Sequence, residues 1–183
     1  MIGSNAIGEE IVVLRAIRRI VTVLALGALP LAAPAAALGS YGPITNYNSR
    51  KCVDVTNRST ANGALIQQWD CTRGSNQQWE IRALGQSGYF QIVNQNSQKC
   101  LDVTGRATYN GALIQQWDCT GGSNQAWQLI AREIGPGAFD WEIQNQGSHL
   151  VLDVRGASKL NGGLIQQWAF NGGWNQLWSG SAL

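Results

Sequence analysis

The five residues LIQQW occur three times in the chain, at 65–69, 113–117 and 164–168. The residues around them also recur in the same order, so the copies belong to a longer repeat. An Asp-Val pair comes before each copy, at Asp54, Asp102 and Asp153. An Asn-Gly pair lies between the Asp-Val pair and LIQQW, and an Asn-Gln-x-Trp stretch comes after each copy. A repeat of this length organises the whole fold, so it has to be interpreted before any local structure.

Each repeat has the composition of four short strands. In the second repeat these are the segments 90–94, 99–103, 112–117 and 125–130, which are rich in Val, Ile, Trp and Phe and bounded by Gly, Asn, Ser and Asp. No segment has a helical period long enough to predict a helix. A closed threefold arrangement leaves no exposed sheet edge. We therefore predict an all-β protein, a β-trefoil of twelve strands in three four-stranded repeats with pseudo-threefold symmetry. The repeats are expected at about 41–84, 85–134 and 135–183.

The first 37 residues differ in composition from the rest of the chain. Three arginines, ending at Arg19, precede an apolar run at 20–29, and alanines at 35–37 supply a small-residue cleavage site. An uncleaved membrane anchor is the alternative, but the run is short of the roughly 20 residues a span needs and is followed by Pro30 and Pro34. We therefore expect residues 1–37 to be a secretory signal peptide that is removed. The mature domain is then 38–183, secreted and extracellular.

The predicted mature chain is close to neutral. The leader holds three of the arginines and two of the glutamates, so ten basic and nine acidic side chains remain. No strong field is left to attract phosphates or anionic lipid, which makes nucleic acid an unfavourable partner and gives no reason to expect membrane insertion. The chain has few charges but many Gly, Asn and Gln and eight Trp. This composition favours neutral polar partners.

The four cysteines fall at equivalent positions of two repeats, and the third repeat lacks both. Its corresponding residues are Val151 and Phe170. Pairing within a repeat explains why a repeat has both cysteines or neither, although four cysteines allow three connectivities. A metal site is the alternative, but the spacing is unlike zinc motifs and export exposes the chain to oxidising conditions, so we predict no metal. The predicted disulfides join Cys52 to Cys71 and Cys100 to Cys119.

Two tryptophans recur in each repeat, and their neighbours predict different environments. Those that end the Asn-Gln-x-Trp stretch, at Trp79, Trp127 and Trp178, adjoin apolar strand residues and are expected in a symmetric core. Those that end LIQQW follow two glutamines. Strand alternation puts Ile66 on one face, and Leu65, Gln67 and Trp69 on the other. An unpaired glutamine is unfavourable in a core. We expect this strand end to be half exposed.

The repeated order Asp-Val, Asn-Gly, Ile-Gln-x-Trp and Asn-Gln-x-Trp resembles that of the ricin B-chain-type lectin domains and the family 13 carbohydrate-binding modules. The resemblance covers about 41–181. It implies one shallow sugar site in each repeat. The positions that match the family's sugar-binding residues are Asp54, Gln67, Trp69, Asn76 and Gln77 in the first repeat, Asp102, Gln115, Trp117, Asn124 and Gln125 in the second, and Asp153, Gln166, Trp168, Asn175 and Gln176 in the third.

These residue types suit a sugar ring. An ionised Asp accepts hydrogen bonds from hydroxyls, the amides supply donors, and the indole gives the C–H face an apolar floor. We expect the glutamine of the Asn-Gln pair to hold the aspartate in place rather than to touch the sugar. Contacts that discriminate between sugars are expected in the loops 56–61 and 104–109. In the third repeat Trp174 replaces a serine, and it would either extend or obstruct that pocket.

The sequence therefore predicts a secreted lectin with up to three sites for galactoside-like or xylan-like glycans and no cofactor. The alternatives are a β-trefoil that binds proteins, such as a protease inhibitor, or an accessory subunit of a separately encoded glycoside hydrolase. An enzyme is not expected. The single histidine, His149, has no predicted partner for nucleophilic catalysis, and the repeated aspartates lack the second carboxylate that a glycosidase needs.

Overall fold

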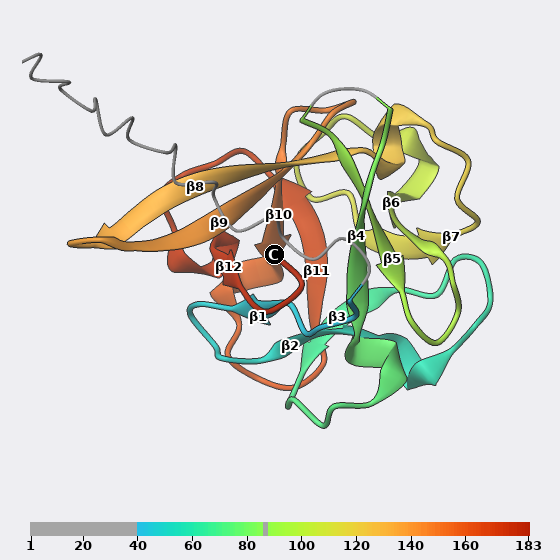
Figure 1. Cartoon of the computed structure of the whole chain (residues 1–183), viewed down its shortest axis with the longest axis horizontal. Helices are drawn as coiled ribbons and strands as arrows, with labels where there is room; N and C mark the ends of the chain where they lie inside the picture. The colour runs from blue at the N-terminus through green and yellow to red at the C-terminus, as the bar shows by residue number, and fades with distance from the viewer. Residues whose placement is uncertain (1–39, 86–87) are drawn as a thin grey trace, which may run out of the picture. The chain divides into compact units, whose positions relative to one another are not determined.

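The computed structural model describes residues 40–85 and 88–183 (Figure 1). The predicted signal peptide lies outside these residues. Within them, no helix has the length and apolar character required to cross a membrane. The described residues form twelve β-strands and six short 3-10 helices.

Every repeat contributes four strands, as predicted. The strands of the first repeat are β1 (Thr45–Asn46), β2 (Cys52–Val55), β3 (Ile66–Trp69) and β4 (Trp79–Ala83). Those of the second are β5 (Phe90–Asn94), β6 (Cys100–Val103), β7 (Ile114–Trp117) and β8 (Trp127–Gly135). Those of the third are β9 (Ala138–Asn145), β10 (Val151–Val154), β11 (Gly163–Trp168) and β12 (Trp178–Ser179). The all-β trefoil prediction is confirmed.

The 3-10 helices occupy two equivalent places in every repeat. One follows the Asp-Val strand, at Thr56–Arg58, Thr104–Arg106 and Arg155–Ala157. The other carries the Asn-Gln pair, at Ser75–Gln77, Ser123–Gln125 and Trp174–Gln176. The strand predicted at 125–130 was wrong at both ends, because Gln125 belongs to the helix and β8 extends to Gly135.

The central hairpins share one register. β2 pairs with β3, β6 with β7 and β10 with β11, all antiparallel. Consequently Asp54 lies opposite Gln67, and the equivalent pairs are Asp102 with Gln115 and Asp153 with Gln166. Directly opposed residues on one sheet face have close side chains. The repeat therefore places a carboxylate beside an amide three times.

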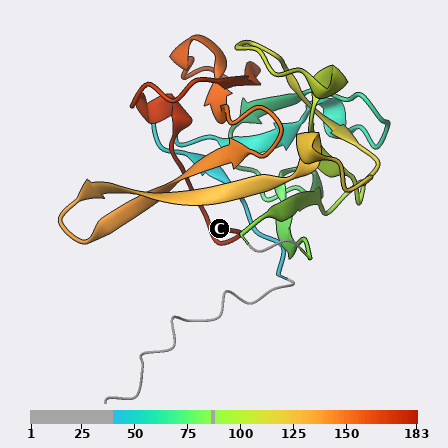
Figure 2. The same ribbon diagram turned by 90° about the horizontal axis from the view of Figure 1, so that it is seen from above.

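The hairpin of β8 and β9 departs from the symmetry. Its strands have nine and eight residues, and they pair from Trp127 and Asn145 out to Gly135 and Ala138. The hairpin extends beyond the other strands, as the long orange ribbon in Figures 1 and 2 shows. The three additional residues of the last repeat interval fall in this segment.

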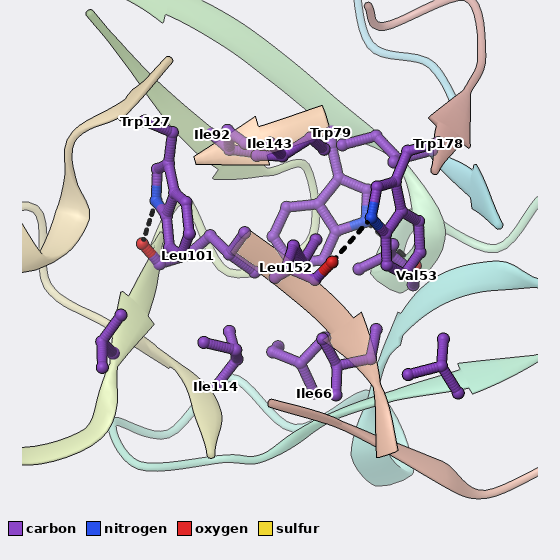
Figure 3. Close-up of a cluster of buried hydrophobic side chains, with 14 of the residues drawn as sticks. Val53, Ile66, Trp79, Ile92, Leu101, Ile114, Trp127, Ile143, Leu152 and Trp178 are labelled. Carbon is purple, nitrogen blue, oxygen red and sulfur yellow. Dashed lines mark hydrogen bonds between the residues drawn. The ribbon is translucent and has the colours of Figure 1, made fainter. Parts of the chain in front are cut away.

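The core is built from one tryptophan per repeat and the aliphatic residues around it (Figure 3). Trp79, Trp127 and Trp178 are each 0% exposed, which confirms the predicted symmetric core. The three indoles donate Nε1–H to the backbone carbonyls of Val53, Leu101 and Leu152, at 3.0, 3.0 and 3.1 Å. A buried indole keeps its N–H satisfied in this way.

The second glutamine of LIQQW joins neighbouring repeats. Gln68 is fully buried and donates from Nε2 to the carbonyls of Ser158 and Leu160 in the third repeat, at 2.8 and 2.9 Å. Its Oε1 accepts from Ser49 Oγ at 2.6 Å. Gln116 and Gln167 make the equivalent bonds. Each repeat thus holds a loop of another.

Both predicted disulfides are present. Cys52 is bonded to Cys71 and Cys100 to Cys119, each across a sequence separation of 19 residues. The third repeat uses a different contact at this place. The guanidinium of Arg132 lies 4.7 Å from the ring centre of Phe170, and the buried Glu142 accepts from Arg132 Nε at 2.7 Å. A buried carboxylate therefore fixes the cation over the ring.

Removing the second disulfide by a double Cys100→Ser, Cys119→Ser change is expected to lower the free energy of unfolding by about 3 kcal/mol. The bond restricts the unfolded chain, and a loop of this length gives a stabilisation of that order. Urea denaturation of the oxidised proteins measures the loss. A reductant should lower the wild-type midpoint and have no further effect on a variant that lacks both bonds. Equal midpoints of the wild type and the double variant would contradict the prediction.

Candidate functional site

The first of three equivalent polar clusters is centred on Asp54. This residue lies on β2, Gln67 lies opposite it on β3, and Asn76 and Gln77 come from the following 3-10 helix. Gln67 Nε2 donates to Asp54 Oδ1 at 2.9 Å. Asn76 Nδ2 and Gln77 Nε2 donate to Oδ2 at 2.7 and 2.9 Å. Four residues separated by up to 23 positions are therefore joined through one buried carboxylate.

The second and third clusters repeat this geometry. Asp102 accepts from Gln115, Asn124 and Gln125 at 2.8, 2.6 and 2.8 Å. In the third cluster Asp153 accepts from Gln166 at 2.9 Å and from Asn175 at 2.7 Å, and Gln176 Nε2 donates to the carbonyl of Ala169 at 3.0 Å. A carboxylate has about four acceptor positions, so each aspartate keeps capacity for a ligand hydroxyl.

The glutamine of the Asn-Gln pair has the contacts of a positioning group. Gln77 is buried, and besides Asp54 its Nε2 contacts the carbonyl of Asp70 at 2.9 Å. Its Oε1 accepts from the backbone N–H of Thr72 at 2.7 Å. It therefore fixes both the carboxylate and the loop after Trp69.

The second set of tryptophans lies at the surface. Trp69, Trp117 and Trp168 are 40%, 40% and 38% exposed. Along β3, Ile66 and Gln68 are buried whereas Trp69 is exposed, as the alternation predicts. An indole with one open face offers an apolar platform to a ligand.

The polar clusters and surface tryptophans line three separate pockets with volumes of about 230, 340 and 580 Å³ in the first, second and third repeat. Fourteen of the fifteen predicted residues contribute to the lining. The first pocket includes Asp54, Gln67, Trp69, Asn76 and Gln77; the second Asp102, Gln115, Trp117, Asn124 and Gln125; the third Asp153, Gln166, Trp168 and Asn175. The exception, Gln176, is fully buried behind its pocket. That these residues bind a sugar stays a prediction.

The surface tryptophan of each pocket packs against a turn of another repeat, which the sequence did not predict. Gly162 of the third repeat lies against Trp69, and a Cβ placed on it would be 3.9 Å from the indole. Asn161 next to it donates from Nδ2 to Asp70 Oδ2 at 2.7 Å and accepts from the Asp70 N–H at 3.0 Å. The other two Asn-Gly pairs lie in the same way against Trp117 and Trp168. Each surface indole is therefore supported by another repeat, and in the third pocket the glycine, Gly111, also belongs to the lining.

Trp174 neither extends nor obstructs the lining of the third pocket. Its side chain packs edge-on against Tyr47, with ring centres 4.7 Å apart, and is 60% exposed. The third pocket is lined instead by Asn171 where the others have Thr72 and Thr120.

Arginines also line the pockets, and the sequence interpretation did not name them. They are Arg58 in the first pocket, Arg106 in the second and Arg155 in the third. Arg58 and Arg106 have left-handed backbones, with φ of 54° and 55°, a conformation uncommon outside glycine. Arg58 and Arg106 lie in the loops 56–61 and 104–109, which were expected to discriminate between sugars. This position could have identified them as pocket residues from the sequence.

Two of the pocket aspartates have raised pKa values. Burial raises the pKa of Asp102, and hydrogen bonds from Gln115, Gln125 and Asn124, together with the charge of Arg106, offset part of this. Burial also raises the pKa of Asp153, against the bonds from its own amide neighbours. The carboxylates still act as acceptors once the pH is above these pKa values.

We expect ligand affinity at the second and third pockets to fall as the pH is lowered, beginning at a higher pH than for an ordinary aspartate. The ionised form is the acceptor, and a raised pKa means that protonation removes it earlier. Titration calorimetry between pH 7 and pH 4 measures the loss. An Asp118→Asn variant is the control and should keep the pH dependence of the wild type. The hydrogen bond from Lys99 lowers the pKa of the exposed Asp118 carboxyl, so this group is not the one that is protonated first. Affinity independent of pH over this range would contradict the assignment.

The twelve strands and three equivalent pockets define a β-trefoil of the lectin type. A family model described as ricin-type beta-trefoil lectin domain-like matches residues 36–117, 76–168 and 123–182. The chain belongs to this family.

Solved structures agree with this assignment. The designed threefold-symmetric protein ThreeFoil is 36% identical, with a TM-score of 0.71 over 76% of this chain and 96% of its own. The exo-β-1,3-galactanase 1,3Gal43A from Clostridium thermocellum is also 36% identical, with a TM-score of 0.71, but the match spans 76% of this chain and only 29% of the galactanase. A ricin B-like lectin from Macrolepiota procera, in complex with lactose, shares the fold at 21% identity and a TM-score of 0.65, over 78% of this chain and 94% of that lectin.

Proposed function

We propose that the protein is a non-catalytic lectin that binds glycans through one shallow site per repeat. The observation that carries the proposal is the threefold juxtaposition of a buried, amide-held carboxylate with a half-exposed indole. The carboxylate and amides suit hydroxyls, and the indole suits the C–H face of a pyranose. Family membership supports a glycan ligand, and the galactanase match favours a galactoside-like one over the xylan-like alternative.

Single sites of this kind are weak, and their number compensates. An open pocket with one stacking surface is expected to bind in the millimolar to high-micromolar range, near −4 to −6 kcal/mol. Three sites on one domain increase the avidity for a polysaccharide or a glycan-coated surface by powers of ten without a new contact. The proposed partner is therefore a repetitive glycan.

A glycan array probed with residues 38–183 tests the proposal. Binding to glycans that is competed by the free sugar supports it. Loss of that binding in a variant with Trp69, Trp117 and Trp168 all changed to alanine assigns it to the pockets. If no glycan is bound while a protein partner is retained by this variant, the protein-binding alternative replaces the proposal.

An accessory role beside a glycoside hydrolase is the second candidate. It is favoured by the galactanase, because this chain matches 29% of that enzyme. Co-purification with a hydrolase from the native source tests the role. A protein that binds glycan and is recovered alone is a free lectin.

We further propose that the chain is exported and that residues 1–37 are removed. The two disulfides support export, because such bonds persist in oxidising compartments. Mass determination of the secreted protein tests the cleavage, with a mature start near Leu38 expected. A cell-retained, full-length protein would contradict it.

A further inference from the structure

Each pocket contains one arginine that has no carboxylate partner. Four ion pairs occur among residues 40–85 and 88–183, and they use Lys51, Arg82, Lys99 and Arg132. Of the six other basic residues in these ranges, three line the pockets: Arg58, Arg106 and Arg155. Half of the basic residues without an ion pair in these ranges therefore lie where the ligand is expected, one in each pocket.

The pocket carboxylates do not neutralise these arginines through contact. Both oxygens of Asp54 are bonded to amides, and no ion pair between Asp54 and Arg58 is present in the described part of the chain. Asp102 interacts with Arg106 only through its longer-range charge. Each guanidinium thus keeps its five N–H donors for a ligand.

In the first two pockets the guanidinium lies beside the glycine that precedes the Asn-Gln helix. Arg58 Nη2 lies 2.9 Å from the place where a Cβ on Gly74 would be, and Arg106 Nη2 lies 3.5 Å from the same place on Gly122. The side-chain oxygens of Asn76 and Asn124 lie 2.7 Å from these same two points. The guanidinium is therefore next to the amide of the Asn-Gln pair.

An unused acceptor lies beside each of these two guanidinium groups. The side-chain oxygens of Asn76 and Asn124 are buried and accept no hydrogen bond, while their nitrogens are bonded to the aspartates. Buried amide oxygens are rarely left unpaired, and an unpaired one calls for a missing partner. These oxygens are closed to solvent, so the group of each corner that a ligand can reach is the exposed arginine.

We propose that the pockets prefer anionic sugars, in which a uronic carboxylate or a sulfate ester binds the arginine while the aspartate, amides and indole hold the ring. The inference rests on the proposed lectin function. The guanidinium matches carboxylate and sulfate oxygens in pairs, and such charge-assisted bonds are stronger than neutral ones. The near-neutral net charge of the domain means that the preference is local to the pockets.

Titration calorimetry with galactose, galacturonic acid and galactose 6-sulfate tests the inference on residues 38–183. We expect at least one acidic sugar to bind on the order of tenfold more tightly than galactose at low salt. The acidic sugar with the larger gain in affinity over galactose shows whether the arginines prefer a carboxylate or a sulfate ester. The ratio should fall as salt is raised, since the site is open to solvent.

Two variants localise the effect. In Arg58→Gln, Arg106→Gln, Arg155→Gln the ratio of acidic to neutral affinity should fall to about one. The control is Arg73→Gln, Lys159→Gln, whose side chains are basic but line none of the three pockets. It should keep the ratio of the wild type.

The outcomes separate the inference from the function it rests on. Equal affinity for acidic and neutral sugars, or a preference that survives the triple arginine change, overturns the inference and leaves the lectin proposal standing. Absence of binding to all sugars and glycans overturns both. If the triple variant does not fold, the salt dependence of the wild type provides the test. A ratio of acidic to neutral affinity that does not change with salt overturns the inference.

Discussion

Alanine at Trp127 is expected to lower the free energy of unfolding by about 3–5 kcal/mol, whereas alanine at Trp117 should cost far less and remove the ligand site of the second repeat. Trp127 is fully buried and its indole N–H is bonded to Leu101, so its removal leaves a large cavity and an unpaired carbonyl. Trp117 is 40% exposed and lines a pocket. Chemical denaturation and glycan binding of both variants measure the two effects.

The two residues form a matched pair, because both are tryptophans at a fixed place in the same repeat. The pair Trp79 and Trp69 provides the same comparison in the first repeat. A large loss of stability from the Trp117 change, or unimpaired ligand binding after it, would contradict the assignment of the exposed indoles to the pockets.

Alanine at Asp54, Asp102 and Asp153 should remove one binding site for each residue changed, with none left in the triple variant. Each change also leaves buried amides without their acceptor, which is expected to cost about 1–3 kcal/mol per site. Titration calorimetry of the single variants gives the number of sites, and thermal denaturation gives the stability. Both are measured before the triple variant is made.

Asp118→Ala is the control for these changes. Asp118 directly follows a pocket tryptophan, but its side chain is exposed, is bonded to Lys99 and Asn62, and makes no bond to the cluster of Asp102. It should lower the stability little, since solvent screens an exposed pair. Three sites retained in the single pocket variants would show that the aspartates are not the ligand groups.

The sequence was sufficient for the architecture because the repeat carries it. Short apolar segments between turn residues gave the number of strands, and equivalent cysteines gave the disulfides. The two kinds of tryptophan were separable by the strand in which each lies, because Trp69 shares a strand face with Gln67, whereas Trp79 begins a strand in which it shares a face with Ile81. Local sequence patterns were therefore enough for features whose interactions lie within one repeat.

Contacts between repeats could not be predicted in the same way. Identical motifs do not say which copy faces which, so the bonds from Gln68 to Ser158 and Leu160 had no sequence signal. The left-handed backbone of Arg58, a residue that rarely adopts it, was equally hidden. The bonds of Gln68 form because closure of the threefold arrangement brings together repeats that are distant in sequence.

The position of Asn161 and Gly162 against Trp69 has a consequence for synthesis. The chain leaves the ribosome from its N-terminus, so the first repeat is made long before the turn that packs against its exposed indole. A chain that stops short of Asn161 contains every residue that lines the first pocket but lacks this support for Trp69. Trp69 is therefore held in its final position only after the last third of the protein has been made and has docked.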